Sequence, residues 1–124
     1  MENKRILYGD DNEQLRNSLA RALKLRKLEV DLASTPQELV TKARANKYHA
    51  VITDLDYTSE GREGYSVLKE IKDLPTLKVL YTGQAGYEFL PEAFESGANY
   101  AILNKNQHQL MDLLDKELGG ENGN

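Results

Sequence analysis

The sequence predicts a doubly wound α/β domain, in which a five-stranded parallel sheet of strand order 2-1-3-4-5 carries helices on both faces. Short apolar segments alternate five times with stretches whose apolar residues recur at helical spacing, the pattern of repeated strand-and-helix units. The segment Ala50-Val-Ile-Thr53 ends at Asp54 and suits a strand that is buried on both faces. By contrast, Leu28-Glu-Val-Asp-Leu32 alternates apolar and polar residues, which suits a half-exposed strand at a sheet edge.

We expect the first strand over residues 4–8 and a helix after it, because the Asn12 side chain can cap a helix N-terminus. The apolar face of this helix is formed by Leu15, Leu19, Ala22 and Leu23. The edge strand of residues 28–32 leads to a second helix, which runs to about residue 46. Residues 35–38 predict its start, because they supply an N-cap threonine, a proline at the first helical position and a capping-box glutamate.

The central strand of residues 50–53 ends at the acidic segment 54–56, and a polar loop follows over residues 57–64. A helix is predicted over residues 65–73, because apolar residues recur there at helical spacing and Pro75 closes the segment. Its inward face is formed by Val67, Leu68, Ile71 and Leu74. Residues 77–81 are again apolar and predict a fourth strand of the buried type.

The last two units complete the alternation of strands and helices. A short helix is predicted over residues 89–96, with Pro91 in its first turn and Gly97 at its end. Residues 100–103 predict the fifth strand. The final helix carries its apolar face on Leu110, Met111, Leu114 and Leu118.

The length of 124 residues allows one domain with a real core but is too short for two. We expect residues 1–118 to form the domain and residues 119–124 to be a disordered tail. The chain has no cysteine, which excludes disulfides, thiolate catalysis and zinc–cysteine sites. No apolar run approaches the ~20 residues that a membrane span needs, and no signal-peptide pattern is present, so we expect a cytoplasmic protein without membrane contact.

The net charge is −4, but basic residues gather on the first predicted helix. They are Arg16, Arg21, Lys24, Arg26 and Lys27. Such a patch could meet an acidic partner or a nucleic-acid backbone. Because neither aromatic interleaving nor a DNA-binding motif accompanies it, a solvated helix face without direct nucleic-acid binding is favoured.

Polar side chains follow four of the five predicted strands: Asp10 and Asp11, then Asp54, Thr82 and Lys105. In the order 2-1-3-4-5 these strand ends are neighbours, so the groups are expected to share one crevice. Three carboxylates repel one another, and either one of them takes up a proton or a hard cation neutralises them. Oxygen ligands in this number suit Mg²⁺. With a lysine and a hydroxyl beside them, they predict a site for phosphoryl transfer to a carboxylate.

From about residue 4 to residue 118 the chain resembles the response-regulator receiver domains of two-component signalling. The matching segments are, in order, Ile6-Leu-Tyr-Gly-Asp-Asp11, Val51-Ile-Thr-Asp54, Val79-Leu-Tyr-Thr-Gly83 and Gly97-Ala-Asn-Tyr-Ala-Ile-Leu-Asn-Lys105. The resemblance implies a flavodoxin-like fold of five βα units. It also implies a protein that takes a phosphoryl group from a histidine kinase or a histidine phosphotransfer protein and has no enzymatic activity beyond its own phosphorylation and dephosphorylation.

The resemblance implies roles for particular residues. Asp54 would be the phospho-acceptor, with Thr82 and Lys105 as its catalytic partners. Thr82 and Tyr100 would be the switch residues that alter a protein-binding surface on the fourth and fifth units, in a monomer or a phosphorylation-dependent dimer. The Mg²⁺ ligands would be Asp10, Asp11, Asp54 and the backbone carbonyl of Asp56.

The chain departs from the family pattern in three places. Asn106 stands where the family has a proline after the lysine, and a cis peptide bond before a residue other than proline costs about 3 kcal/mol or more, so we expect a trans bond or a distorted loop. The loop after Asp54 lacks the usual Met-Pro pair. The segment between Thr82 and Gly97 is short, which predicts a short fourth helix.

Two other functions compete with the phospho-acceptor. A receiver-like interaction module could work without phosphorylation, although it would have no chemical need for the acid cluster and Lys105. Asp54-Leu-Asp-Tyr-Thr58 also resembles the Asp-x-Asp-x-Thr motif of haloacid-dehalogenase-type phosphatases. That family places metal-binding acids after its lysine, and here the acids in that region, Asp112 and Asp115, belong to an amphipathic helix.

Overall fold

The computed structural model of the protein describes residues 4–83 and 85–119. It contains one five-stranded parallel sheet of order β2-β1-β3-β4-β5, which confirms the predicted fold class. The strands are β1 (Arg5–Gly9), β2 (Glu29–Ala33), β3 (Ala50–Thr53), β4 (Leu77–Tyr81) and β5 (Tyr100–Ile102). The helices are α1 (Glu13–Leu25), α2 (Pro36–Ala45), α3 (Glu63–Glu70), α4 (Leu90–Ser96) and α5 (Gln107–Leu118), with one 3₁₀ turn, η1 (Tyr87–Phe89), before α4.

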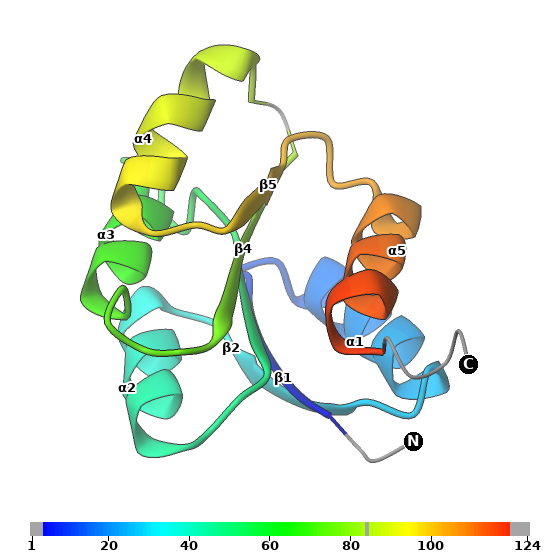
Figure 1. The fold of residues 1–124 in the computed structure, drawn as a ribbon. Coiled ribbons are helices and arrows are strands. Elements are labelled where there is room, and N and C mark those ends of the chain that lie inside the picture. The colour runs from blue at the N-terminus through cyan, green and yellow to red at the C-terminus, as the bar shows by residue number, and fades with distance from the viewer. Residues whose placement is uncertain (1–3, 84, 120–124) are drawn as a thin grey trace.

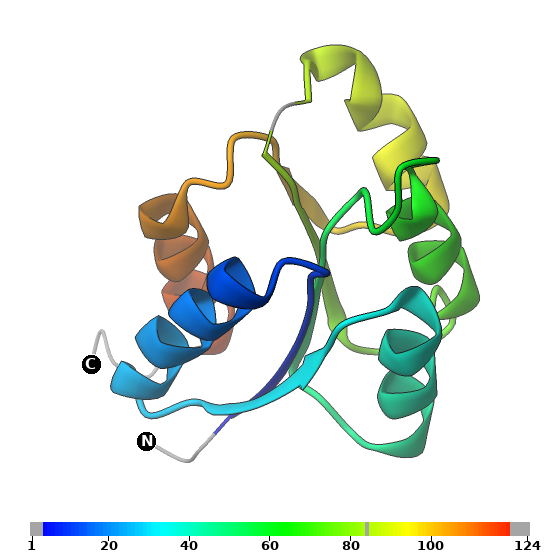
Figure 2. The ribbon, with the colours of Figure 1, turned by 180° about the vertical axis from the view of Figure 1, so that it is seen from behind.

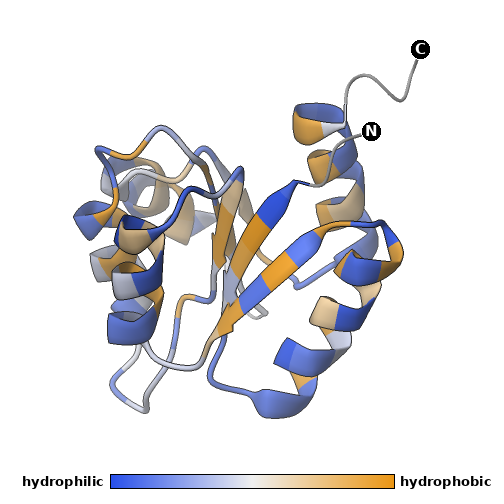
Figure 3. Ribbon diagram, turned by 90° about the horizontal axis from the view of Figure 1, so that it is seen from below, coloured by the Kyte–Doolittle hydropathy of each residue, from blue (hydrophilic) through white to orange (hydrophobic). Residues whose placement is uncertain are grey.

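Helices cover both faces of the sheet: α1 and α5 lie on one face, and α2, α3 and α4 lie on the other (Figure 1, Figure 2). Successive strand residues point to opposite faces, so each strand supplies both cores. In β1, Ile6 and Tyr8 join the core beneath α1 and α5, while Leu7 joins the core beneath α2 and α3. Hydrophobic residues concentrate on the strands and the inner sides of the helices, as Figure 3 shows.

The register of the central strands brings two of the acidic strand ends together. Gly9 of β1 pairs directly with Thr53 of β3, so Asp10 and Asp54 follow at the same level of the sheet. The half-exposed strand β2 lies at the sheet edge, as its alternating pattern predicts. Strands β4 and β5 end on the far side of β3, which aligns the segments that carry Thr82 and Lys105 with the acids.

The helix starts read from the sequence are largely confirmed. Asn12 caps α1 by accepting a hydrogen bond from Leu15 N, and Thr35 caps α2 by accepting one from Glu38 N. The Glu38 carboxylate closes the turn from the other side, but it accepts from Ser34 N (2.8 Å) and not from the N-cap residue itself. Predicted and observed strand limits differ by one residue at β1, β2 and β5, which is within the ordinary fraying of element ends.

The predicted start of α3 is wrong by two residues. The helix begins at Glu63 and not at Tyr65, and it ends at Glu70. The reason is a contact between distant segments: Gly64 N donates to Leu55 O at 2.7 Å, and Glu63 Oε1 accepts from Tyr57 N at 2.9 Å. These bonds fix the first turn of α3 on the end of β3. The strand before this loop has the predicted bounds, because β3 ends at Thr53 and residues 54–56 follow it as loop.

The fourth helix is short, as predicted, and it has seven residues. Gly97 ends it at φ +123°, a conformation that favours glycine. Of the predicted tail, Gly119 is described and ends α5, while residues 120–124 lie outside the described residues. Over residues 4–83 and 85–119, no helix is both long and apolar enough to cross a bilayer.

Asn106 has a local role that a proline could not fill. Its side-chain oxygen caps α5 by accepting a hydrogen bond from Gln109 N at 2.9 Å, and its own N–H donates to Asn104 Oδ1 at 3.1 Å. The bond between Lys105 and Asn106 is trans, as expected. The loop is also distorted, because Lys105 has φ +46° in the left-handed region.

Replacing Asn106 with alanine is expected to lower the free energy of unfolding by about 1 kcal/mol, because the first turn of α5 loses its cap. Urea unfolding of Asn106→Ala measures the loss. Asn106→Ser is the matched control, since serine can cap the same turn and should retain most of the stability. An equal loss in both variants would contradict the capping role.

Candidate functional site

The acid cluster lies at the carboxyl ends of β1 and β3. Carboxylate oxygens of Asp10, Asp11 and Asp54 lie within 4.8 Å of one another. Asp10 is fully buried, Asp54 is 6% exposed and Asp11 is exposed, so the cluster extends from the core to solvent. The sequence predicted that these three side chains would share one crevice, and the structure brings them together there.

Lys105 reaches this cluster from the loop after β5. Its Nζ lies 2.7 Å from Asp10 Oδ2 and 3.3 Å from Asp54 Oδ2, so one ammonium group bridges both acids. The strained backbone of Lys105 is held at both of its ends: its N–H donates to Thr82 O at 2.9 Å, and its carbonyl accepts from the Tyr81 hydroxyl at 3.0 Å. Asn106 therefore does not prevent the lysine from reaching the acids.

Asp10 is held by three donors. Its Oδ2 accepts from the Tyr8 hydroxyl (2.5 Å) and from Lys105 Nζ (2.7 Å), and its Oδ1 accepts from Asn12 N (2.9 Å). Burial alone would raise the pKa of Asp10, but the hydrogen bonds from Lys105, Tyr8 and the Asn12 N–H outweigh it and hold this pKa below its ordinary value. Burial, together with the neighbouring carboxylate, raises the pKa of Tyr8, which therefore stays a donor.

Asp54 behaves in the opposite way. Burial raises the pKa of Asp54 to about 6, and the negative charge of Asp10 adds to this, although Lys105 acts in the other direction. Its Oδ1 accepts from Leu55 N at 2.8 Å, while its Oδ2 is directed to Lys105. Of the three acids in the cluster, Asp54 is therefore the one that takes up a proton as the pH falls below about 6.

The donor set also fits a hard divalent cation. All the side-chain ligands are carboxylate oxygens, which Mg²⁺ prefers to nitrogen or sulfur. Asp11 is exposed and open to an entering ion, while Asp10 and Asp54 are fixed by hydrogen bonds. Burial is the main cause of the raised pKa of Asp54, and a cation at this position would offset the repulsion from Asp10 that adds to it.

Asp56 shapes the loop beside the cluster. Its exposed side chain accepts a hydrogen bond from Arg62 N at 2.7 Å, and Gly61 between them has φ +83°. The carboxylate thus braces the β3–α3 loop. The role predicted for its backbone carbonyl, as a metal ligand, stays a prediction.

The two predicted switch residues lie in different surroundings, Thr82 in the interior and Tyr100 near the surface. Thr82 is buried at the end of β4, where its N–H donates to Ile102 O and its carbonyl accepts from Lys105 N. Tyr100 starts β5 and directs its hydroxyl to Glu117 Oε2 of α5 at 2.8 Å, on the outer surface of the domain. The hydrogen bond to Glu117 raises the pKa of Tyr100.

Sequence reasoning missed three buried tyrosines around the cluster: Tyr8, Tyr57 and Tyr81. Tyr57 lies across the end of β1, and its hydroxyl lies 2.9 Å from Thr53 Oγ1. A Cβ on Gly9 would come within 2.4 Å of that hydroxyl, so the glycine makes room for the ring. A glycine inside a strand is a signal of such a close approach, and Gly9 could have indicated it.

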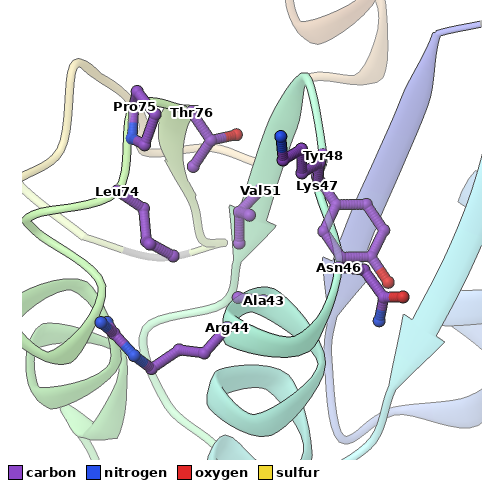
Figure 4. A pocket seen from close by; sticks show the side chains of 9 residues that line it. All are labelled: Ala43, Arg44, Asn46, Lys47, Tyr48, Val51, Leu74, Pro75 and Thr76. Atoms are coloured by element: carbon purple, nitrogen blue, oxygen red, sulfur yellow. The ribbon is translucent and has the colours of Figure 1, made fainter.

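A separate pocket lies away from the acid cluster. It has a volume of about 430 Å³ and is formed by the end of α2, the segment before β3 and the α3–β4 loop, at the opposite end of the strands (Figure 4). It is lined by Ala43, Arg44, Asn46, Lys47, Tyr48, Val51, Leu74, Pro75 and Thr76. The guanidinium of Arg44 is already paired with Asp73, at 3.0 Å from each carboxylate oxygen. The acid cluster, with its perturbed carboxylates and bridging lysine, is the stronger candidate site.

The phosphatase alternative lacks its second acidic group at the site. Asp112 and Asp115 lie on α5, where they pair with His108 (3.5 Å) and Arg26, and all four side chains are well exposed. The acids that gather around Asp54 are instead those of β1, which precede it in the sequence.

The site is thus organised around one strand-end carboxylate, Asp54, which lies between Asp10 and Lys105 at the end of a doubly wound sheet. The chain matches the family model of the response regulator receiver domain over residues 6–116. It therefore belongs to the receiver domains of two-component response regulators. No match to a curated protein was found.

Solved structures agree with this assignment of the fold. The CheY-like receiver domain protein from Methanospirillum hungatei has a TM-score of 0.85 at 25% identity, with 98% of each chain covered. Chemotaxis protein CheY4 from Vibrio cholerae has a TM-score of 0.83 at 20% identity, over 94% of this chain and 100% of that chain. Response regulator TrrA from Thermotoga maritima, solved in complex with Mg²⁺-BeF, has a TM-score of 0.79 at 25% identity, over 93% and 99%.

Proposed function

We propose that this receiver domain takes a phosphoryl group from the phosphohistidine of a histidine kinase or histidine phosphotransfer protein onto Asp54, with Mg²⁺ as cofactor. The observation that carries the proposal is the position of Asp54. It is almost buried at the end of β3, with Asp10 on one side and Lys105 3.3 Å from its Oδ2. The related TrrA structure, which contains Mg²⁺-BeF, supports the cofactor.

The chemistry follows from the two oxygens of Asp54. Oδ1 is held by Leu55 N, so Oδ2 is the oxygen that attacks phosphorus. The phosphorus–oxygen bond forms as the phosphorus–nitrogen bond of the donor histidine breaks, and its electron pair returns to the imidazole. Lys105 then pairs with a phosphoryl oxygen, and the Thr82 hydroxyl donates to another. A Mg²⁺ ion held by Asp10, Asp11, Asp54 and the Asp56 carbonyl would neutralise the charge that accumulates.

The output would be a changed protein-binding surface. In the present conformation the Tyr100 hydroxyl donates a hydrogen bond to Glu117 Oε2, which holds the tyrosine side chain at the surface beside α5. Movement of Thr82 toward the phosphoryl group would repack the end of β4 and favour another arrangement of Tyr100. The downstream partner would be a protein, bound by a monomer or by a dimer that phosphorylation favours. Water would remove the phosphoryl group from Asp54, and no separate substrate would be turned over.

Intact mass spectrometry after incubation with a small phosphodonor tests the proposal. Wild type should gain one labile phosphoryl group with Mg²⁺ and none after chelation, whereas Asp54→Asn should gain none under either condition. Steady donor hydrolysis without an adduct would favour the phosphatase. A folded protein with neither adduct nor hydrolysis would favour the phosphorylation-independent module.

A further inference from the structure

The buried Tyr8 side chain has no role in the proposed reaction, but it contacts Asp10 of the acid cluster. Tyr8 lies on β1 and is 1% exposed. Its hydroxyl donates to Asp10 Oδ2 at 2.5 Å, the same oxygen that accepts from Lys105 Nζ. We propose that Tyr8 is a positioning residue, which rests on the proposed function: it fixes the Asp10 carboxylate so that one oxygen meets Lys105 while the acid stays aligned with Asp54 for a divalent cation.

The phenol is itself held in place. The ring of Tyr8 meets the ring of Tyr81 edge-on, with centroids 6.3 Å apart and planes at 72°. The Tyr81 hydroxyl donates to the Lys105 carbonyl at 3.0 Å. The two tyrosines therefore hold both partners of the buried ion pair: Tyr8 holds the Asp10 carboxylate, and Tyr81 holds the Lys105 backbone. This support acts where Lys105 is held at φ +46°.

The hydrogen-bond pattern shows why the phenol matters for orientation. Asn12 N fixes Oδ1 of Asp10, and Lys105 is a flexible chain that can follow either acid. Tyr8 is the rigid donor to Oδ2, since its ring is packed in the core beneath α1 and α5. Partners behind a metal ligand that orient it typically account for 10–100-fold in metal affinity. Loss of the Tyr8 hydroxyl should therefore act on cation binding as well as on the fold.

The chain offers a matched control. Tyr48 is also buried, at 8% exposure, and its hydroxyl donates to Asp31 Oδ2 at 2.6 Å, so it makes the same phenol–carboxylate bond away from the acid cluster. Binding of Mg²⁺ alone is measured by titration of Tyr8→Phe, Tyr48→Phe and wild type. We expect the dissociation constant to rise about 10-fold in Tyr8→Phe and to change less than about twofold in Tyr48→Phe. A change below twofold in Tyr8→Phe, or equal changes in both variants, would overturn the proposal.

A measurement without metal separates this proposal from the proposed function. The carboxyl carbon resonance of Asp10 in the Mg²⁺-free protein should shift in Tyr8→Phe and stay in place in Tyr48→Phe. In wild type, a slowly exchanging Tyr8 hydroxyl proton coupled to that carbon would support the contact even if the variant failed to fold, and absence of the coupling would overturn it. A wild type that binds Mg²⁺ but accepts no phosphoryl group would contradict the proposed function while the role of Tyr8 at the cation site still held.

Discussion

Replacing Asp54 with asparagine is expected to stabilise the Mg²⁺-free protein at pH 7.5 by up to about 3 kcal/mol, although it removes the proposed phospho-acceptor. In the folded protein the pKa of Asp54 is raised from 3.8 to about 6, mainly by burial. At pH 7.5 the carboxylate is ionised in both states, so folding bears the cost of burying this charge beside Asp10. Each unit of pKa shift corresponds to about 1.4 kcal/mol, which gives the expected gain.

The pH dependence identifies the cause. A carboxyl group whose folded pKa is raised contributes stability below its unfolded pKa and loses it as the pH rises through the folded value. Wild type should therefore become less stable between about pH 4 and pH 7, and Asp54→Asn should lack this decrease. Asp10, whose pKa is lowered, contributes in the opposite sense and loses stability only as the pH falls below its ordinary range.

Urea unfolding at pH 4.5 and pH 7.5, with chelator, measures both effects. Asp112→Asn is the matched control, because Asp112 is exposed and should change the free energy of unfolding by no more than about 0.5 kcal/mol. Addition of Mg²⁺ should stabilise wild type more than Asp54→Asn and narrow the gap between them. An Asp54→Asn variant no more stable than wild type at pH 7.5 would show that the buried charge does not strain the fold.

Replacing Gly64 with alanine is expected to destabilise the domain by about 3 kcal/mol and to impair phosphoryl uptake at the same time. A Cβ at this position would lie 2.3 Å from the Asp54 carbonyl oxygen and 2.8 Å from Leu55 Cα. Both are backbone atoms, so no side-chain rotation can relieve the clash. Either α3 moves away from the sheet, which breaks the bond from Gly64 N to Leu55 O, or the backbone of Asp54 moves.

Gly83→Ala is the matched control for this substitution. The nearest atom to a Cβ at Gly83 is Lys105 Cδ at 4.0 Å, an ordinary contact, so the change should cost little stability. Chemical unfolding and the rate of mass gain with a phosphodonor, measured side by side, distinguish the two glycines. If Gly64→Ala unfolded within about 0.5 kcal/mol of wild type, the close packing of α3 against the end of β3 would be refuted.

Both substitutions act on the same few atoms at the end of β3. Asp54 is destabilising because it is buried, and it is buried because Gly64 lets α3 pack against the loop that follows it. Because the buried Asp54 carboxylate lowers the free energy of unfolding, stability does not explain its presence, which agrees with a functional role for this acid.

The sequence by itself determined the order of strands, the two faces of helices and the acids at the strand ends. These follow from local periodicity and from the geometry of parallel sheets. A short run such as residues 50–53, which ends on acid and is followed by a polar loop, favours a buried strand. Parallel strands then place Asp10, Asp54 and Lys105 at one edge of the sheet. The caps at Asn12 and Thr35 are equally local, because each bonds to a backbone N–H three residues away.

Only the tertiary structure decided the start of α3 and the support beneath the site. The first turn of α3 depends on a hydrogen bond to Leu55, nine residues before Gly64. The Tyr8 ring of β1 contacts the Tyr81 ring of β4, although β3 lies between these two strands in the sheet. A tyrosine in an apolar strand looks like any core residue, since its pattern does not tell whether its hydroxyl finds a carboxylate. Whether the hydroxyl reaches a carboxylate depends on strand register and side-chain packing. These bring together residues that are far apart in the sequence, so they leave no periodic signal in it.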